Sequence, residues 1–445
     1  MYVYIVQFFL VFCNSNIVYC ERICYNVVRI LKIGVKIMGK IIFSENEYRF
    51  SGTALAANDS TALAVAVKCS ADIDDGAKWG YSELVAKTST NGGEEWSEEK
   101  TILAPPARTI TAEKGNSKTA FFRNPVLSTA ANGDFVLVFT FYPESEGADN
   151  KKLLDKKKVS FTFFGGKNCL VLYDRDGKFY TVTEDGKVLD ATKAPTQYAL
   201  KGLGDLYNGD EFLGNIYLNG AMGKSENEEV NASFGAPLKA AKRSYIMAMT
   251  SADGVNWSEP VNITPAVLAA DDGVTMATGT GNGVVCDSGR IVVPVMTDKG
   301  AASIYSDDNG VTWLRNQRFP YMPVKKAVTI VQAPTGELIA LGKKSGISND
   351  KGITWMSYKS KVAPVSALAM ADKICTIANA KAGTAQIGGE FKINKKGKLK
   401  GINYNKEKSE LAGGLLPCAT LATVAGKPAV LYITPDNKQV SFTAL

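Results

Sequence analysis

One absence restricts the chemistry that this 445-residue chain can perform: the sequence contains no histidine. Catalysis by Ser-His-Asp or Cys-His groups and metal sites with histidine ligands are therefore excluded. Any reaction must use Asp, Glu, Tyr, Lys, Arg or Cys side chains. The eight cysteines lack the spacing of a zinc site, and there is no P-loop for phosphates. We therefore expect neither a metal nor a cofactor.

Carboxylates do recur in one repeated motif. Residues 306–313 and 348–355 both read S-x-D-x-G-x-x-W, and weaker copies end at Trp96 and Trp257. In the copy that ends at Trp96 the Asp position holds Asn91, and in the copy that ends at Trp257 it holds Ala252. An Asp caps backbone N–H groups, Gly supplies a positive φ, and Trp is large enough to cover the turn. We interpret the motifs as structural turns that do not touch a substrate.

The elements that carry these turns are short strands. From residue 40 onward, apolar runs such as ALAVAV and FVLVFTFY alternate with Gly, Asn and Asp turns. Trp257 and Trp313 are 56 residues apart, and Trp313 and Trp355 are 42 apart. One four-stranded propeller blade takes about 40 to 50 residues. We predict an all-β fold, a six-bladed β-propeller over residues 38–445, with a β-hairpin insertion in roughly 145–225.

The charge balance is mildly basic. Lys and Arg exceed Asp and Glu by 51 − 44 = 7, which suits an acidic ligand. The lysine-rich runs 150–158 and 394–400 are interpreted as solvated loops, so we expect no nucleic-acid partner. The five cysteines after residue 37 are scattered and odd in number, which predicts buried thiols and no disulfide framework.

Residues 1–37 allow three interpretations. They could be a signal peptide, a short anchor, or an extension foreign to a native chain that starts at Met38. No other segment is long enough to cross a bilayer, so we expect no stable membrane span. The first interpretation predicts a secreted or cell-surface protein, and a start at Met38 predicts a cytoplasmic one.

On these motifs the chain resembles the sialidases, six-bladed propeller glycosidases whose blades carry such Asp boxes. The likeness covers roughly residues 41–440 and is greatest to secreted bacterial and protozoan exo-sialidases. Tyr48-Arg49-Phe50-Ser51 looks like the opening Phe/Tyr-Arg-Ile-Pro motif of the family. Residues 119–127 resemble its Asp-Pro strand, 279–313 its central blade, and 427–433 its closing strand.

The resemblance implies a defined chemistry. The family holds the carboxylate of sialic acid with three arginines, because a planar guanidinium binds carboxylate through two hydrogen bonds. Its nucleophile is a tyrosine, an exception among glycosidases. A glutamate activates that tyrosine, and an aspartate acts as general acid and base.

Only part of this set has a counterpart here. The resemblance assigns Arg49 to the first arginine and Asp74 to the acid/base. The Asp-Ala-Arg triplet that precedes this aspartate reads Ala66-Val67-Lys68, and the aspartate of the Asp-Pro strand is Asn124.

The remaining positions are substituted. Lys325 stands near the position of the activating glutamate, and Lys343 or Lys344 at that of the second arginine. No arginine lies near Gln386, where the third is expected, and Leu416-Pro417-Cys418 replaces the tyrosine, with Pro417 as its best match. Tyr432 lies inside a strand, where packing is its expected role.

Three functions follow as hypotheses. The first is a pseudoenzyme that recognises sialic-acid-bearing or other acidic glycans with weak or no hydrolysis. Its substrate-binding candidates are Arg49, Lys68, Asn124, Lys325 and Lys343, with Asp74 as the catalytic candidate. The second is an active exo-α-sialidase, and the third is a structural or adhesive propeller that binds no sugar. Sialoside turnover that is abolished by Asp74→Ala would favour the second, and failure to bind any acidic glycan would favour the third.

Overall fold

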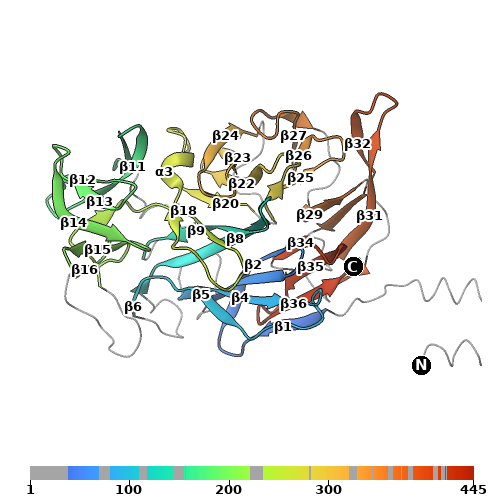
Figure 1. Ribbon diagram of the computed structural model, residues 1–445, viewed down its shortest axis with the longest axis horizontal. Coiled ribbons are helices and arrows are strands. Elements are labelled where there is room, and N and C mark those ends of the chain that lie inside the picture. Colours follow the sequence, from blue (N-terminus) through green and yellow to red (C-terminus); the bar gives the residue numbers. More distant parts are fainter. Residues whose placement is uncertain are drawn as a thin grey trace, which may run out of the picture.

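The computed structural model shows six β-sheets arranged in a ring (Figure 1). It describes residues 39–69, 81–109, 118–144, 155, 157–220, 234–279, 282–319, 328–342, 344–358, 364–371, 373–378, 384–403, 409–411, 416 and 418–445. Within these ranges the chain is almost entirely strand, with one short helix, α3 (Thr264–Val267). The predicted all-β, six-bladed propeller is confirmed.

Each blade is an antiparallel sheet of four main strands. Blades I and II consist of β2 (Arg49–Ala57), β3 (Ala62–Cys69), β4 (Ser82–Ser89) and β5 (Lys100–Leu103), and of β8 (Phe121–Thr129), β9 (Phe135–Tyr142), β18 (Tyr245–Ser251) and β19 (Val261–Asn262). Blades III and IV consist of β20 (Met276–Thr278), β22 (Ile291–Thr297), β23 (Gly300–Ser306) and β24 (Leu314–Arg318), and of β25 (Thr329–Gln332), β26 (Leu338–Leu341), β27 (Ser345–Ser348) and β28 (Met356–Tyr358). Blades V and VI consist of β29 (Pro364–Met370), β30 (Lys373–Ala378), β31 (Thr384–Ile393) and β32 (Leu399–Asn403), and of β34 (Ala419–Val424), β35 (Lys427–Ile433), β36 (Gln439–Ala444) and β1 (Lys40–Ser44). The short strands β21 (Val284–Val285) and β33 (Ser409–Glu410) extend blades III and V, and β6 (Ala107–Thr109) pairs with β7 (Lys118–Thr119).

Blade VI is built from both ends of the described chain. Strand β1 is its outermost strand and pairs antiparallel with β36, so that Lys40 lies opposite Phe442. Because the first strand completes the last blade, the ring closes through backbone hydrogen bonds between segments far apart in sequence.

The second strand of a blade is buried on both faces. All side chains from Ala62 to Val67 in β3 are buried, and so are all of those in β9. This pattern follows because each blade packs between two neighbours, which explains the continuous apolar runs ALAVAV and FVLVFTFY.

The innermost strands of the blades face the centre of the ring. The last residues of these strands meet at one end of the propeller, where they line a common cavity that includes Ala57, Thr129 and Thr423. We call this the Ala57 end. The opposite end, where β2 begins, is called the Arg49 end.

The four Asp-box motifs join the third and fourth strands of blades I to IV. In the third copy Ser306 Oγ donates to Asp308 Oδ1 at 2.8 Å, and Asp308 Oδ1 accepts from Thr312 N at 2.8 Å. The indole Nε1 of Trp313 donates to Gly310 O at 3.0 Å. The other tryptophans bond the glycine carbonyl in the same way, as seen for Trp96, Trp257 and Trp355. The boxes are therefore structural turns, as predicted.

The second box corrects one detail of our alignment. Ala252 does not occupy the Asp position, because Asp253 does: its Oδ1 accepts from Ser251 Oγ at 3.1 Å and from Asn256 N at 2.7 Å. This copy is one residue shorter between Asp and Trp, so a fixed eight-residue spacing misplaced the acid. In the first copy Asn91 Oδ1 accepts from Glu95 N at 2.9 Å, so the amide preserves the turn.

Each box also packs on the preceding blade. The rings of Trp96 in blade I and Phe442 in blade VI meet edge to face with centroids 5.2 Å apart. A Cβ on Gly93, which has φ +90°, would lie 2.4 Å from the Phe442 ring. The boxes thus join neighbouring blades as well as strands.

The insertion lies between β9 and β18 and forms a sheet beside the ring (Figure 1, green). The predicted hairpin is present as β11 (Lys167–Tyr173) and β12 (Phe179–Val182). The sheet also contains β10 (Phe161–Phe164), β13 (Lys187–Leu189), β14 (Pro195–Lys201), β15 (Asp205–Asn208), β16 (Glu211–Asn215) and β17 (Lys239–Ala240). Tyr217 attaches the insertion to blade II, because its ring packs edge to face on Phe141 and Tyr245.

Four of the five cysteines among the described residues are buried, namely Cys69, Cys169, Cys286 and Cys375, and Cys418 is half-buried. The expectation that most of them are buried is thus confirmed. No helix in the described part of the chain has the length and apolar character that crossing a membrane requires. Residues 1–37, with their three interpretations, lie outside the described residues.

Candidate functional site

Arg49 is the first residue of β2 and defines the Arg49 end of the propeller. Its partner across the sheet is Cys69, the last residue of β3. One guanidinium nitrogen donates to Tyr48 O at 3.3 Å. The side chain is half-buried.

Arg123 and Asn124 come from the next inner strand, β8. The register of β8 with β9 shifts after Arg123, and Asn124 adopts a positive φ of 49°. Thr278 of blade III holds Asn124 in place: its Oγ1 donates to Asn124 O at 2.5 Å, and Asn124 Nδ2 donates to Thr278 O at 3.4 Å. The amide of Asn124 therefore joins blades II and III.

Blades I and II approach closely at this point. A Cβ on Gly52 of β2 would lie 2.8 Å from Pro125 Cδ, so only glycine allows the contact. Burial raises the pKa of the Cys69 thiol, and the positive charge of Arg123 opposes that rise. The charge of Arg123 therefore acts on Cys69, the residue opposite Arg49. Our sequence analysis did not single out Arg123, although it directly precedes Asn124 in the strand that carries the resemblance.

Lys68 is placed differently from Arg49. It pairs with Phe50 in the register of β2 and β3, one residue from the Arg49–Cys69 pair, so its side chain projects from the other face of the sheet. Its ammonium lies 2.5 Å from Glu45 and 2.8 Å from Glu99, and 4.9 Å from the ring centre of Tyr48. Lys68 is therefore engaged with carboxylates of the protein.

Cys418 directly precedes β34, where the resemblance expects the tyrosine nucleophile. Thr53 Oγ1 donates to its sulfur at 3.5 Å, and burial raises the pKa of the thiol. A thiol with a raised pKa is uncharged at neutral pH and is a poor nucleophile. Tyr432 is buried and donates to Leu411 O at 3.1 Å, which agrees with the packing role expected for it.

A tyrosine and a glutamate do meet elsewhere at this end of blade I. Tyr81 OH lies 3.4 Å from Glu83 Oε2, and Thr101 Oγ1 lies 3.3 Å from the same oxygen. Burial and the Glu83 carboxylate raise the pKa of Tyr81, and burial raises that of Glu83. The phenol is therefore held in its neutral form.

Three predicted residues, Asp74, Lys325 and Lys343, lie outside the described residues, as does Pro417. The neighbour of Lys343, Lys344, is exposed and precedes β27. The structure therefore places Arg49 and Asn124 on adjacent inner strands, and Arg123 directly precedes Asn124. The side chain of Lys68 lies on the opposite face of blade I from that of Arg49.

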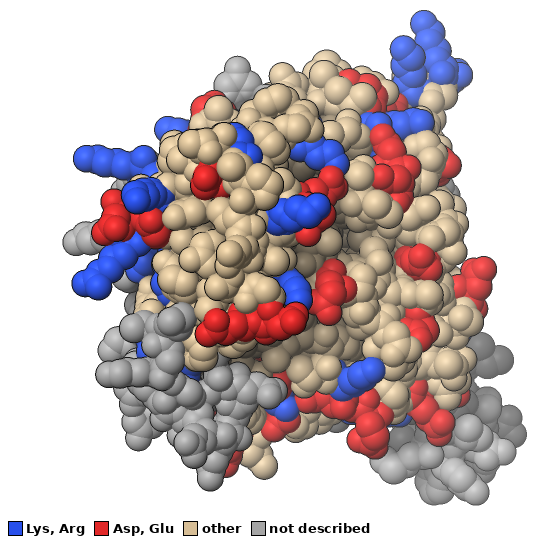
Figure 2. All heavy atoms as spheres, turned by 60° about the vertical axis from the view of Figure 1, so that its left-hand side comes forward, with Lys and Arg blue, Asp and Glu red and all other residues tan. Residues whose placement is uncertain are grey.

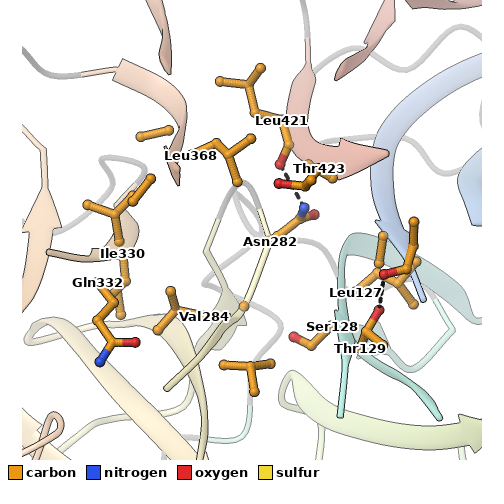
Figure 3. Close-up of a pocket in the computed structure, with 18 of the residues that line it drawn as sticks. Leu127, Ser128, Thr129, Asn282, Val284, Ile330, Gln332, Leu368, Leu421 and Thr423 are labelled. Carbon is orange, nitrogen blue, oxygen red and sulfur yellow. Dashed lines mark hydrogen bonds between the residues drawn. The ribbon is translucent and has the colours of Figure 1, made fainter. Parts of the chain in front are cut away.

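The cavity at the Ala57 end is of a different character (Figure 3). It has a volume of about 440 Å³. Asn282 reaches across it and donates to Leu421 O at 2.7 Å, and Thr129 Oγ1 donates to Ala57 O at 3.0 Å. Its lining carries one charged residue, Asp287, and no cation. An anionic sugar would find no counter-charge there.

Charges of both signs are interspersed on the surface shown in Figure 2. Among the described residues, no three Cys, Asp or Glu side chains are grouped so that they could hold a metal ion.

No family model matches the chain. A sialidase of Paraclostridium sordellii is 25% identical over 278 residues, which cover 58% of this chain and 63% of that protein. The intramolecular trans-sialidase of Ruminococcus gnavus, solved with oseltamivir carboxylate, has a TM-score of 0.72 at 18% identity, covering 92% of this chain and 97% of its own. The leech intramolecular trans-sialidase, solved with 2,7-anhydro-Neu5Ac, has a TM-score of 0.72 at 19% identity, covering 92% of this chain and 70% of its own.

These likenesses and the Asp boxes define a class of protein, the β-propellers whose four-stranded blades carry Asp-box turns. Within that class the chain is sialidase-like, in sequence over part of its length and in fold over nearly all of it. It spans somewhat less than two thirds of the sialidase that it matches in sequence.

Proposed function

We propose that the protein recognises glycans that carry sialic acid or another acidic sugar at the Arg49 end of the propeller. The observation that carries this proposal is that Arg49 and Arg123 lie on adjacent inner strands, β2 and β8, which approach closely where Gly52 faces Pro125. Two guanidinium groups at one end of the propeller are suited to the carboxylate of an acidic sugar. Such glycans are found on secreted and cell-surface molecules, so we place the protein there as well.

We further propose that hydrolysis is weak or absent. The segment in which the nucleophile is expected, residues 416–418, has Pro417 as the best match and contains no tyrosine, and the thiol of Cys418 is uncharged because burial raises its pKa. Asn124 replaces an aspartate and is bonded to Thr278. A catalytic set that acts as a unit loses several orders of magnitude in rate when its nucleophile is removed.

The test uses the full chain on an array of sialylated and neutral glycans. We expect binding to sialylated glycans, with a loss of at least tenfold in Arg49→Ala and in Arg123→Ala and partial binding in Arg49→Lys. Arg175, exposed in a turn of the insertion, provides the matched control, and Arg175→Ala should bind like the parent. Failure to bind any acidic glycan would contradict the proposal and favour a purely structural propeller.

The second candidate is an active sialidase, which the similarity to the Paraclostridium sordellii enzyme favours. Incubation with 3'-sialyllactose separates the two candidates, with free sialic acid and 2,7-anhydro-Neu5Ac measured as products. We expect neither product above background. Release of either one, abolished by Asp74→Ala, would establish catalysis and overturn the pseudoenzyme proposal.

A further inference from the structure

The outer hairpin of blade V, β31 and β32, extends beyond the rest of its blade (Figure 1). The last pair between β31 and β30 is Glu390 with Lys373, and β31 continues for three more residues, to Ile393. The turn of the hairpin lies at the Ala57 end, because β31 runs antiparallel to β30, which itself starts beside Ala371 of the cavity. We call residues 391–403 the basic hairpin.

Its turn is well ordered by local hydrogen bonds. Asn394 N donates to Lys398 O at 2.9 Å, and Asn394 Oδ1 accepts from Lys396 N at 2.8 Å and Lys398 N at 3.1 Å. Gly397 supplies the positive φ of 71° that such a turn requires. The side chains at the tip are thus presented on a fixed backbone.

Lysines dominate this surface. Five are exposed, and the basic hairpin has no acidic residue; the lysines are Lys392, Lys395, Lys396, Lys398 and Lys400. None of them forms an ion pair with a described carboxylate, whereas exposed lysines of the insertion do, such as Lys187 with Asp185 at 2.6 Å. The hairpin therefore concentrates positive charge that the described part of the protein leaves uncompensated.

The residue types in the basic hairpin indicate what kind of partner it would bind. Arginine, which binds phosphate or sulfate through two parallel hydrogen bonds, does not occur in the hairpin, and its one aromatic residue, Phe391, is buried and presents no ring on which a base could stack. Lysines act here as point charges, and the apolar Ile393 beside them is 43% exposed. Point charges next to an exposed aliphatic side chain suit the headgroup region of an anionic bilayer.

We propose that the basic hairpin docks the protein on membranes that contain anionic phospholipids. Because the turn lies at the Ala57 end, docking leaves the Arg49 end facing away from that bilayer. The attraction is electrostatic, so binding weakens as salt screens the charges. It does not depend on glycan recognition or on catalysis.

The test measures sedimentation of the full chain with vesicles of phosphatidylcholine alone or with 30% phosphatidylserine. We expect binding only to the anionic vesicles, at low and physiological salt, and its loss at high salt. The variant Lys395→Gln/Lys396→Gln/Lys398→Gln should bind on the order of 100-fold more weakly, since each lysine near an anionic surface contributes about fivefold. Ile393→Ser should weaken binding to a smaller extent.

A matched control removes the same charge elsewhere. Lys178→Gln/Lys187→Gln/Lys201→Gln changes three exposed lysines of the insertion and should bind like the parent. Equal binding to both kinds of vesicle, or equal loss in both triple variants, would overturn the proposal. Retention on heparin without binding to anionic vesicles would also overturn it and would identify a sulfated polysaccharide as the partner.

Discussion

Lys68 Nζ lies 2.8 Å from Glu99 Oε1, at the junction of blades I and VI. Glu45, which follows β1 of blade VI, holds the same ammonium from the other side at 2.5 Å. Burial alone would lower the pKa of Lys68, but the hydrogen bonds that its ammonium donates to Glu45 and Glu99 outweigh this effect and raise the pKa. Lys68 therefore joins two blades through its charge.

Lys68→Met should consequently reduce stability more than glycan binding. The substitution leaves two partly buried carboxylates without their cation, which we expect to lower the free energy of unfolding by about 1 to 2 kcal/mol. Urea denaturation measures this loss, with Lys178→Met as an exposed control. Unchanged stability together with lost glycan binding would instead place Lys68 in the site.

The second Asp box allows a direct comparison of neighbouring residues. Asp253→Ala should destabilise the protein by about 1 kcal/mol, because backbone N–H groups lose their acceptor, whereas Ala252→Ser should have no effect. Backbone hydrogen bonds from Asn256 and Val255 hold the pKa of Asp253 well below its usual range. Its contribution is therefore complete above about pH 4 and is lost as the pH falls further. Thermal unfolding at pH 7 and pH 3 checks both statements, and a parallel decrease in the two variants would contradict them.

Lys239 predicts a stability change at alkaline pH. Its ammonium lies 2.5 Å from Leu218 O, and burial lowers its pKa to about 8. Between this value and the usual lysine pKa of about 10.4, the unfolded chain binds more protons than the folded one. The stability contribution of this residue should thus rise with pH, by at most about 1.4 kcal/mol per pH unit. Denaturation of the parent and of Lys239→Gln from pH 7 to pH 10 isolates this contribution, and identical pH profiles would disprove it.

Gly93 controls the contact between blades I and VI. Gly93→Ala would place a methyl group against the Phe442 ring and impose a positive φ on alanine, so we expect a loss of about 2 kcal/mol or more. The double variant Gly93→Ala/Phe442→Leu should recover part of the loss if the ring contact is responsible. Gly177→Ala, also at positive φ but with open space around it, separates backbone strain from the clash. A Gly93→Ala protein as stable as the parent would show that the ring can move aside.

The fold was predictable because its signals are local. Each Asp box specifies a turn within eight residues, and buried strands appear as apolar runs, so the number and kind of blades follow from spacing. The length of the second box was not predictable, since Asp253 and Ala252 are adjacent and only the hydrogen bonds distinguish them.

The site was less predictable because it depends on register and on distant partners. Arg49 and Lys68 both belong to blade I, yet the pairing of β2 with β3 sends their side chains to opposite faces. The two carboxylates that bind Lys68 belong to Glu45 and Glu99, which lie outside β2 and β3. The role proposed for Arg123 depends on the close approach of β8 to β2 in the neighbouring blade, which no local motif encodes.

The closure of blade VI also determines how the ring would respond to force. Lys40 lies opposite Phe442, so the start of β1 and the end of β36 leave the sheet side by side. Pulling on the two ends would load the hydrogen bonds between these strands one after another instead of all together. Optical tweezers should therefore detect a first low-force event of about one strand in length, before any blade unfolds. The pair of β1 and β36 would therefore be the first part of the propeller to separate under load.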